Sequence, residues 1–279
     1  MMFSQLLHRW TARAPEWAKQ LGLAREHEDI AQRHARMATA WAPHLKESRA
    51  TILAAARQCP RRGRALVIGA GDCLDVPVAE LAAIFGEVVL ADIVISRVAQ
   101  SWAKELPGKV RCFNWDASGA LESVAKVRDT VSGDQAPALF AQADPGPPPG
   151  GEPDFIVSAN CLSQLGLVPG HSLPAHVRDA GLPDRCARAA GRRHVAWLAA
   201  RPAALRVLLT DAARLNIGPD GRQLKKETLY ERFGLRDPDR RWRWDLAPIP
   251  EWSPEFHRVH EVGAWFDTPA GPAAASSAW

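Results

Sequence analysis

Residues 65–75 read Ala-Leu-Val-Ile-Gly-Ala-Gly-Asp-Cys-Leu-Asp, and this stretch decides the fold. An apolar run leads directly into Gly69-Ala70-Gly71, and a helix is predicted to follow. Glycine permits a positive φ and lacks the Cβ that would block a ligand, while the start of a helix offers unpaired N–H groups. A strand, a glycine turn and a helix in this order hold nucleotide-like ligands in α/β folds. We therefore expect a ligand site at this turn.

Outward from this turn, short apolar runs alternate with helical stretches. The predicted strands are Ala65–Gly69, Val88–Asp92, Val110–Phe113, Phe155–Ala159 and Leu205–Thr210, and the predicted helices are Val76–Phe85, Ser96–Leu106, Gly119–Arg128 and Cys186–Ala200. Strands that are apolar on both faces and alternate with helices are typical of a parallel sheet covered on each side. The sequence predicts a doubly wound α/β fold.

The two ends of the chain have other patterns. Before residue 60 the composition predicts two or three helices in series, with breaks at Pro15, Gly22 and Pro43. Near the C-terminus, Arg241–Leu246 and His257–Phe266 are predicted to form an antiparallel strand pair. We expect an N-terminal helical cap over 1–60, one α/β domain over 61–267 and a flexible tail over 268–279. Residues 129–153 show neither the two-residue period of a strand nor the 3.6-residue period of a helix, and they are predicted to be a flexible excursion.

Composition and charge exclude several classes of protein. The chain has 279 residues, of which 47% are hydrophobic and 24% charged, so it is long and apolar enough for a globular core. No run approaches the roughly 18 apolar residues of a membrane span, and no secretory signal is evident, so we expect a cytoplasmic protein without membrane contact. A net charge of +4 does not by itself favour nucleic acid as a partner.

Metal and disulfide sites are not expected. The five cysteines are an odd number and include no C-x-x-C pair, which argues against a disulfide framework or a zinc site. His171 and His176 are five residues apart in a loop, which is not the spacing of a helical metal-binding pair.

Two acids follow later strands at positions suited to a nucleoside. Asp92 ends the second strand, where a carboxylate accepts hydrogen bonds from ribose hydroxyls, and Asp116 follows the third strand, where it would face the exocyclic amine of an adenine. A dinucleotide site needs a third glycine where Leu74 stands, and the Gly-Lys-Ser/Thr of a P-loop is absent. S-adenosylmethionine carries no phosphate and is compatible with a looser turn.

These residues give the chain a resemblance to the class I, Rossmann-like S-adenosylmethionine-dependent methyltransferases. The resemblance spans about residues 63–266 and rests on residues 67–71, Asp92, Asp116 and the fourth strand, Asp154 to Asn160. It implies a mostly parallel seven-stranded sheet whose last strand is antiparallel. It also implies S-adenosylmethionine as cofactor, with contacts from Gly69, Ala70, Gly71, Asp92, Ile93, Asp116 and Asn160. The third glycine and the acid often found just before the glycine turn are absent.

Each candidate residue also has a purely structural interpretation. Asp92 and Asp116 have the residue type and position of helix N-caps, and Asp72 and Asp75 those of first-turn acids favoured by a helix dipole. Asn160 lies where the family places its substrate-facing motif, but the Pro-Pro-Tyr/Phe of base methylases does not follow it. His194 and Asp211 are candidates for removing a proton from the acceptor, with packing or capping as the alternative.

The function expected from the sequence is methyl transfer from S-adenosylmethionine to an unidentified acceptor. A small molecule is favoured over RNA or protein. Two alternatives stay open: an NAD(P)-dependent oxidoreductase, and a non-catalytic protein that keeps the fold as a binding scaffold. The run from Arg240 to Trp244 fits either a nucleic-acid contact or a half-buried strand. The oligomeric state is not predicted.

Overall fold

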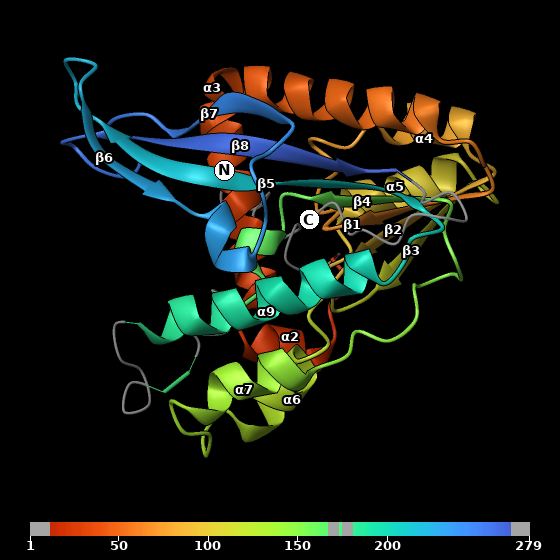
Figure 1. Cartoon of the computed structure of the whole chain (residues 1–279), viewed down its shortest axis with the longest axis horizontal. Helices are drawn as coiled ribbons and strands as arrows, with labels where there is room; N and C mark the ends of the chain where they lie inside the picture. The colour runs from red at the N-terminus through yellow and green to blue at the C-terminus, as the bar shows by residue number, and fades with distance from the viewer. Residues whose placement is uncertain (1–11, 167–172, 175–180, 269–279) are drawn as a thin grey trace.

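A computed structural model of the chain describes residues 12–166, 173–174 and 181–268 (Figure 1). Its elements are, in chain order, α2 (Glu16–Gln20), α3 (Leu23–Gln58), β1 (Arg64–Ile68), α4 (Val78–Ile84), β2 (Glu87–Asp92), α5 (Arg97–Glu105), β3 (Val110–Asn114), α6 (Leu121–Val127), α7 (Gln135–Gln142), β4 (Phe155–Ala159), η1 (Leu162–Gln164), α9 (Leu182–Ala199), β5 (Leu205–Ile217), β6 (Gln223–Thr228), η2 (Tyr230–Phe233), β7 (Arg240–Ala247) and β8 (His257–Asp267).

The strands form a single mixed sheet. Their order is β3-β2-β1-β4-β5-β8-β7, with β6 paired to β5. Strands β1 to β5 pair in parallel, and β8 pairs antiparallel with both β5 and β7. The chain moves outward from β1 through β2 to β3 and then returns to the other side of β1 with β4, which creates a switch point between β1 and β4. Ligands bind at such switch points in open α/β sheets.

Alternating side chains of the inner strands bury both faces of the sheet. Leu66 and Ile68 of β1 face a core shared with α6, α7 and α9, whereas Ala65 and Val67 face a core shared with α3, α4 and α5. Figure 1 shows these two helical layers on opposite sides of the sheet. The predicted doubly wound α/β fold and the antiparallel closing strands are confirmed.

The N-terminal region differs from the prediction at Pro43. Instead of breaking there, α3 runs for 36 residues through Pro43 and leaves helical angles only at Met37 (φ −107°, ψ 18°). A proline inside a helix removes one hydrogen bond and pushes back the carbonyl four residues earlier, which bends a helix on its N-terminal side. Figure 1 shows one arm of α3 along the sheet and the other turning toward α2. Tertiary contacts hold the segment around Pro43, including a hydrogen bond from Trp41 Nε1 to the Leu246 carbonyl (2.9 Å).

Two further elements were not predicted from the sequence. The excursion over 129–153 contains α7, which buries Ala136 and Phe140; its Pro137 lies in the first turn, where the missing N–H costs nothing. The sheet has eight strands because β5 continues to Ile217 and turns back into β6. Strand β6 is largely exposed and polar, so it lacks the apolar alternation of a half-buried strand.

Some predictions concern parts of the chain that the structure does not describe. The tail beyond Thr268, as well as His171 and His176, lies outside the described residues. Within the described part, no helix is both long and apolar enough to cross a bilayer, and no group of three or more His, Cys, Asp or Glu side chains is arranged to hold a metal ion.

Candidate functional site: a pocket at the strand switch point

The two glycines of the turn after β1 have different structural roles. Both have positive φ, 75° at Gly69 and 48° at Gly71. A Cβ on Gly69 would lie 2.7 Å from Cys161 Cβ and 2.9 Å from the Ala159 carbonyl oxygen, so the end of β4 packs directly on this residue. A Cβ on Gly71 would meet no atom within 4 Å. Gly69 therefore serves the packing of the turn, and Gly71 leaves space beside it.

Asp92, at the end of β2, is tied to the glycine turn. Its Oδ2 accepts a hydrogen bond from Gly71 N (2.9 Å) and its Oδ1 accepts one from Val94 N (3.2 Å). Desolvation raises the pKa of this carboxyl above its usual value, and the two N–H groups oppose the shift. Each carboxylate oxygen has a second lone pair, so Asp92 retains capacity to accept hydrogen bonds from a ligand.

Asn160 follows β4 in a left-handed conformation, with φ of 49°. Its backbone N–H donates to the Leu209 carbonyl (2.9 Å), and its Nδ2 donates to Asp75 Oδ2 (2.6 Å). The partner carboxylate fixes the amide orientation, so Oδ1 is the free acceptor. This Oδ1 is buried and has no hydrogen-bond partner among the described residues. Few residues other than glycine have a positive φ, and those that do are concentrated at functional sites.

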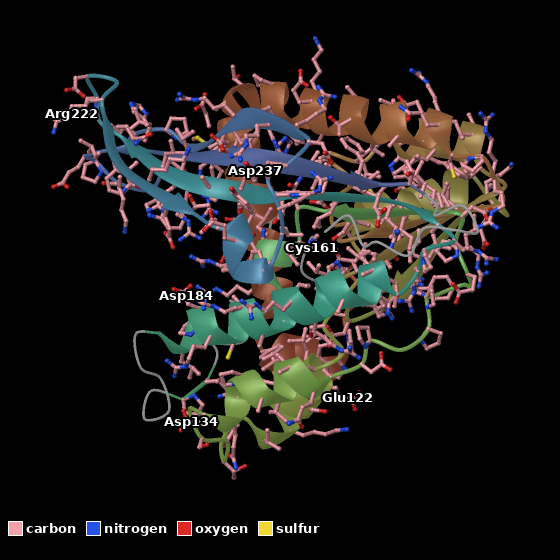
Figure 2. The ribbon with its side chains drawn as sticks, in the orientation of Figure 1. Glu122, Asp134, Cys161, Asp184, Arg222 and Asp237 are labelled. Carbon is pink, nitrogen blue, oxygen red and sulfur yellow. The ribbon has the colours of Figure 1, made fainter. Side chains whose placement is uncertain are left out.

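These residues line a pocket of about 230 Å³. Six of the predicted site residues contribute to its wall: Gly69, Ala70, Gly71, Asp92, Ile93 and Asn160. The lining also includes the carboxylates of Glu26, Asp72, Asp75 and Asp92, and no Lys or Arg of the described chain is part of it. Figure 2 shows Cys161, another lining residue, near the centre of the molecule between the sheet and α9. The pocket is therefore an acidic cavity at the switch point.

Helix α3 closes one side of this pocket. It contributes Leu23, Glu26, His27, Ile30, Trp41, His44 and Leu45. His27 Nε2 lies 3.5 Å from Asp72 Oδ1 and connects the N-terminal arm of the helix to the glycine turn. Burial lowers the pKa of His27, but the hydrogen bond and charge of Asp72 outweigh it, so the pKa is raised overall. Figure 1 shows the N-terminal arm of α3 descending past the sheet toward α2.

Aromatic rings from α3 and β7 form the wall beyond Asn160. The ring of His44 stacks on that of Trp244, with centroids 4.2 Å apart and planes 9° apart, and Trp41 meets Trp244 edge-on at 4.9 Å. Trp242 Nε1 donates to His44 Nδ1 (3.0 Å). We call Trp41, His44 and Trp244, which line the pocket, together with Trp242, which supports His44, the aromatic wall. His44 and Trp244 are 200 positions apart in the sequence, so no local pattern indicated that they meet.

Asp116 does not line the pocket. Its Oδ1 accepts from Ser118 N (2.8 Å) and Ser118 Oγ (2.7 Å), and its Oδ2 accepts from Leu121 N (2.8 Å). Burial raises the pKa of this carboxyl, and these hydrogen bonds partly offset the shift. The structure thus gives Asp116 the capping role at the start of α6 that the sequence left open as an alternative.

His194 and Asp211 also lie outside the pocket lining. His194 is fully buried, with Nε2 2.9 Å from Ser158 Oγ, and burial lowers its pKa to about 4. Asp211 is buried beside His260 (2.9 Å) and accepts from Ser163 Oγ (3.0 Å); desolvation alone would raise its pKa, but His260 lowers it. Both side chains are buried and hydrogen-bonded within the protein, which fits the structural alternative that the sequence left open, and neither belongs to the lining of this pocket.

Comparisons with known proteins find similar solved structures, all at low sequence identity. No protein-family model and no curated protein matches the chain. Among solved structures, it is similar to a 1,6-didemethyltoxoflavin-N1-methyltransferase of Burkholderia thailandensis with bound 1,6-didemethyltoxoflavin and S-adenosylhomocysteine (TM-score 0.38, 15% identity, 87% of this chain and 90% of that one). An O-methyltransferase family protein of the same organism gives a TM-score of 0.40 at 12% identity, over 97% of this chain and 68% of that one. A SAM-dependent methyltransferase of Leishmania major gives 0.38 at 15%, over 94% and 81%.

Proposed function

We propose that the chain is an S-adenosylmethionine-dependent methyltransferase. The observation that carries the proposal is the charge of the pocket: four carboxylates line it, and no Lys or Arg does so among the residues described. A dinucleotide brings a doubly negative pyrophosphate, which needs donors and cations around it. S-adenosylmethionine carries a sulfonium, an ammonium and one carboxylate, so its net charge is positive, and its two cationic groups gain from nearby carboxylates.

The shape of the pocket supports the same cofactor. Gly71 leaves open space beside the turn, and Asp92 retains lone pairs at the end of β2, where it would accept from the ribose hydroxyls. Leu74 lines the pocket at the position where a dinucleotide fold has its third glycine, so its side chain takes space that a pyrophosphate would need. Asn160 Oδ1 is a buried acceptor that no described residue satisfies, which suits an N–H donor of the ligand.

The protein has a modest chemical task in this reaction. When bound, S-adenosylmethionine supplies a methyl group on a positively charged sulfur, which makes the group transferable without a strong catalytic acid or base. The glycine turn and Asp92 hold one end of the pocket, and Asn160 lies between that end and the aromatic wall. Ile30 and Leu45 of α3 contribute apolar side chains to the lining of the pocket, where they would limit the access of water to a bound ligand. Positioning and the exclusion of water are therefore the main contributions of the described residues.

The acceptor is proposed to be a small molecule. The pocket is covered by α3 and lined by acids, which repel the phosphates of a nucleic acid. The arginines of the run from Arg240 to Trp244, which fitted a nucleic-acid contact, are paired within the chain. Arg240 binds Glu47 (3.1 Å), Arg241 binds Asp237 (2.9 Å) and Arg243 binds Asp245 (2.5 Å). These pairs leave little free positive charge on β7.

Calorimetry with the full chain tests the proposal. We expect S-adenosylhomocysteine to bind and NADH not to bind, and Asp92→Ala to weaken S-adenosylhomocysteine binding about tenfold by removing a charged acceptor, on the order of 1.5 kcal/mol. Asp134→Ala is the matched control, because this exposed acid lies at the edge of the α7 layer, far from Cys161 (Figure 2). Unchanged affinity in Asp92→Ala, or preferential binding of NADH, would contradict the proposal.

A further inference from the structure

The ring of His44 is held by two tryptophans. Trp242 Nε1 donates to its Nδ1 (3.0 Å) at the ring edge, and Trp244 stacks on its face (centroids 4.2 Å apart, planes 9° apart). The residue is 2% exposed. A flip of the ring would break the indole hydrogen bond, and a tilt out of its plane would break the stacking on Trp244. His44 therefore presents one constant edge to the pocket that it lines.

The hydrogen bond from Trp242 also determines where the ring proton lies. In a neutral imidazole one nitrogen donates and the other accepts, so a ring that accepts at Nδ1 carries its proton on Nε2. Burial lowers the pKa of His44 to about 4, so the ring is neutral at pH 7. The structure gives Nε2 no hydrogen-bond partner among the described residues, because the bond from Trp242 to Nδ1 is the one that His44 makes. A single N–H donor is left for a ligand.

This donor lies on the side of the pocket that the cofactor does not need. Asp92 ends β2, on one side of β1, whereas Trp244 belongs to β7, beyond β4, β5 and β8 on the other side. Asn160, at the end of β4, lies between the two regions. An adenosine that reaches Asp92 therefore leaves the aromatic wall to the methyl acceptor. Trp244 adds a buried indole N–H that lacks a hydrogen-bond partner in the described structure.

We propose that His44 selects the methyl acceptor by donating a hydrogen bond from Nε2 to a carbonyl oxygen of that molecule. The acceptor would be a small uncharged molecule with an apolar body against Ile30, Trp41 and Leu45, and His44 is its specificity-determining residue. This inference rests on the proposed methyl transfer, because that function assigns the other half of the pocket to the cofactor. With its proton fixed on Nε2, His44 does not act as a base toward the acceptor.

Nitrogen NMR of the histidine side chains tests the tautomer without cofactor or activity. At pH 7 we expect the ¹⁵N shifts of His44 to report a neutral ring protonated at Nε2. In Trp242→Phe, which removes the N–H donor but keeps an aromatic ring, Nδ1 loses its fixed role and we expect a mixture of tautomers. A wild-type ring that is charged, or protonated at Nδ1, would overturn the proposal.

A matched pair of probes tests the carbonyl. 1-Indanone and indane have nearly the same shape and differ by the carbonyl oxygen, and their binding to protein saturated with S-adenosylhomocysteine is followed by NMR titration. We expect 1-indanone to bind wild type about tenfold more tightly than indane, as one well-placed hydrogen bond allows. His44→Leu should abolish this preference, and His44→Gln, which retains an N–H donor, should restore part of it.

The outcomes separate this proposal from the proposed function. Equal binding of the two probes to wild type, failure of 1-indanone to bind, or a preference that survives in His44→Leu would each overturn the role of His44. S-adenosylhomocysteine binding should be unchanged in both His44 variants, which shows that they are folded. Failure of wild type to bind S-adenosylhomocysteine would instead contradict the methyltransferase proposal, and the NMR result would still stand.

Discussion

The two ends of the pocket are built in different ways. At the end next to β1 and β2, where we propose that the cofactor binds, main-chain atoms determine the shape: Gly69 and Gly71 form the turn, and Asp92 ties that turn to β2 through the Gly71 N–H. At the aromatic wall, side chains from α3 and β7 hold one another, and the main chain serves chiefly to bring them together. A binding site made from backbone is local in the sequence, whereas one made from packed side chains draws on distant segments.

The largest effect expected from this comparison concerns the two glycines. Gly69→Ala places a Cβ against the Ala159 carbonyl and Cys161 at a positive φ, and we expect a loss of about 3 kcal/mol in unfolding free energy, or about 5 °C in Tm for a chain of this length. Gly71→Ala meets open space, so we expect a loss of only about 1 kcal/mol with about tenfold weaker S-adenosylhomocysteine binding. Thermal melts and calorimetry on both variants check this; equal melting temperatures would contradict it.

Acid is expected to weaken the aromatic wall. The folded pKa of His44 is about 4, against 6.5 for a free histidine, so between these values the unfolded chain binds a proton that the folded chain does not. Stability from the neutral ring is therefore complete above pH 6.5 and is lost as pH falls toward 4, by an amount on the order of 3 kcal/mol. Urea unfolding of wild type and His44→Leu should show a smaller pH slope in the variant. The remaining slope should include His194, whose pKa shifts in the same direction.

Sequence reasoning placed residues 69–71 and Asp92 at one site, and the structure places them in the lining of one pocket. They could be grouped from the sequence because the turn and Asp92 end two consecutive strands, β1 and β2. Their role in binding a cofactor stays a prediction. The strand that carries Trp242 and Trp244 was predicted, but the aromatic wall was missed because Pro43 was interpreted as a helix end, which left His44 without a predicted place in the fold. Nothing in the pattern around His44 indicates that it meets Trp242, which lies 198 residues further along the chain.

A smaller effect is expected from a comparison of Asp116, which caps a helix, with Asp92, which lines the pocket. Asp116→Ala removes the side-chain cap of α6, so we expect a loss of about 1–2 kcal/mol in unfolding free energy with less than about threefold change in S-adenosylhomocysteine affinity. Asp92→Ala should show the reverse pattern, with affinity affected more than stability. Denaturant titration and calorimetry of the two variants decide this. A tenfold loss of affinity in Asp116→Ala would contradict this expectation and would mean that Asp116 contributes to cofactor binding.

The smallest expected effect concerns the contact between α3 and β7. Arg240 reaches from β7 to Glu47 and Thr51 of α3, at 3.1 Å from each. Both charged partners are almost half exposed, so we expect Glu47→Gln to cost about 0.5 kcal/mol or less, with the difference shrinking at high salt. A loss above about 1 kcal/mol in urea unfolding would mean that this ion pair, rather than the aromatic packing, holds the wall together.

Helix α3 links the two ends of the pocket to the fold itself. Its C-terminal arm contributes Ile52, Ala55 and Ala56 to the same apolar core as β1 and β4, while its N-terminal arm carries His27 and Ile30 over the cavity. The bend at Met37 thus separates an arm that lines the pocket from an arm that also builds the core. A substitution in the N-terminal arm changes the pocket lining, whereas replacement of the whole helix would also remove part of one apolar layer of the fold.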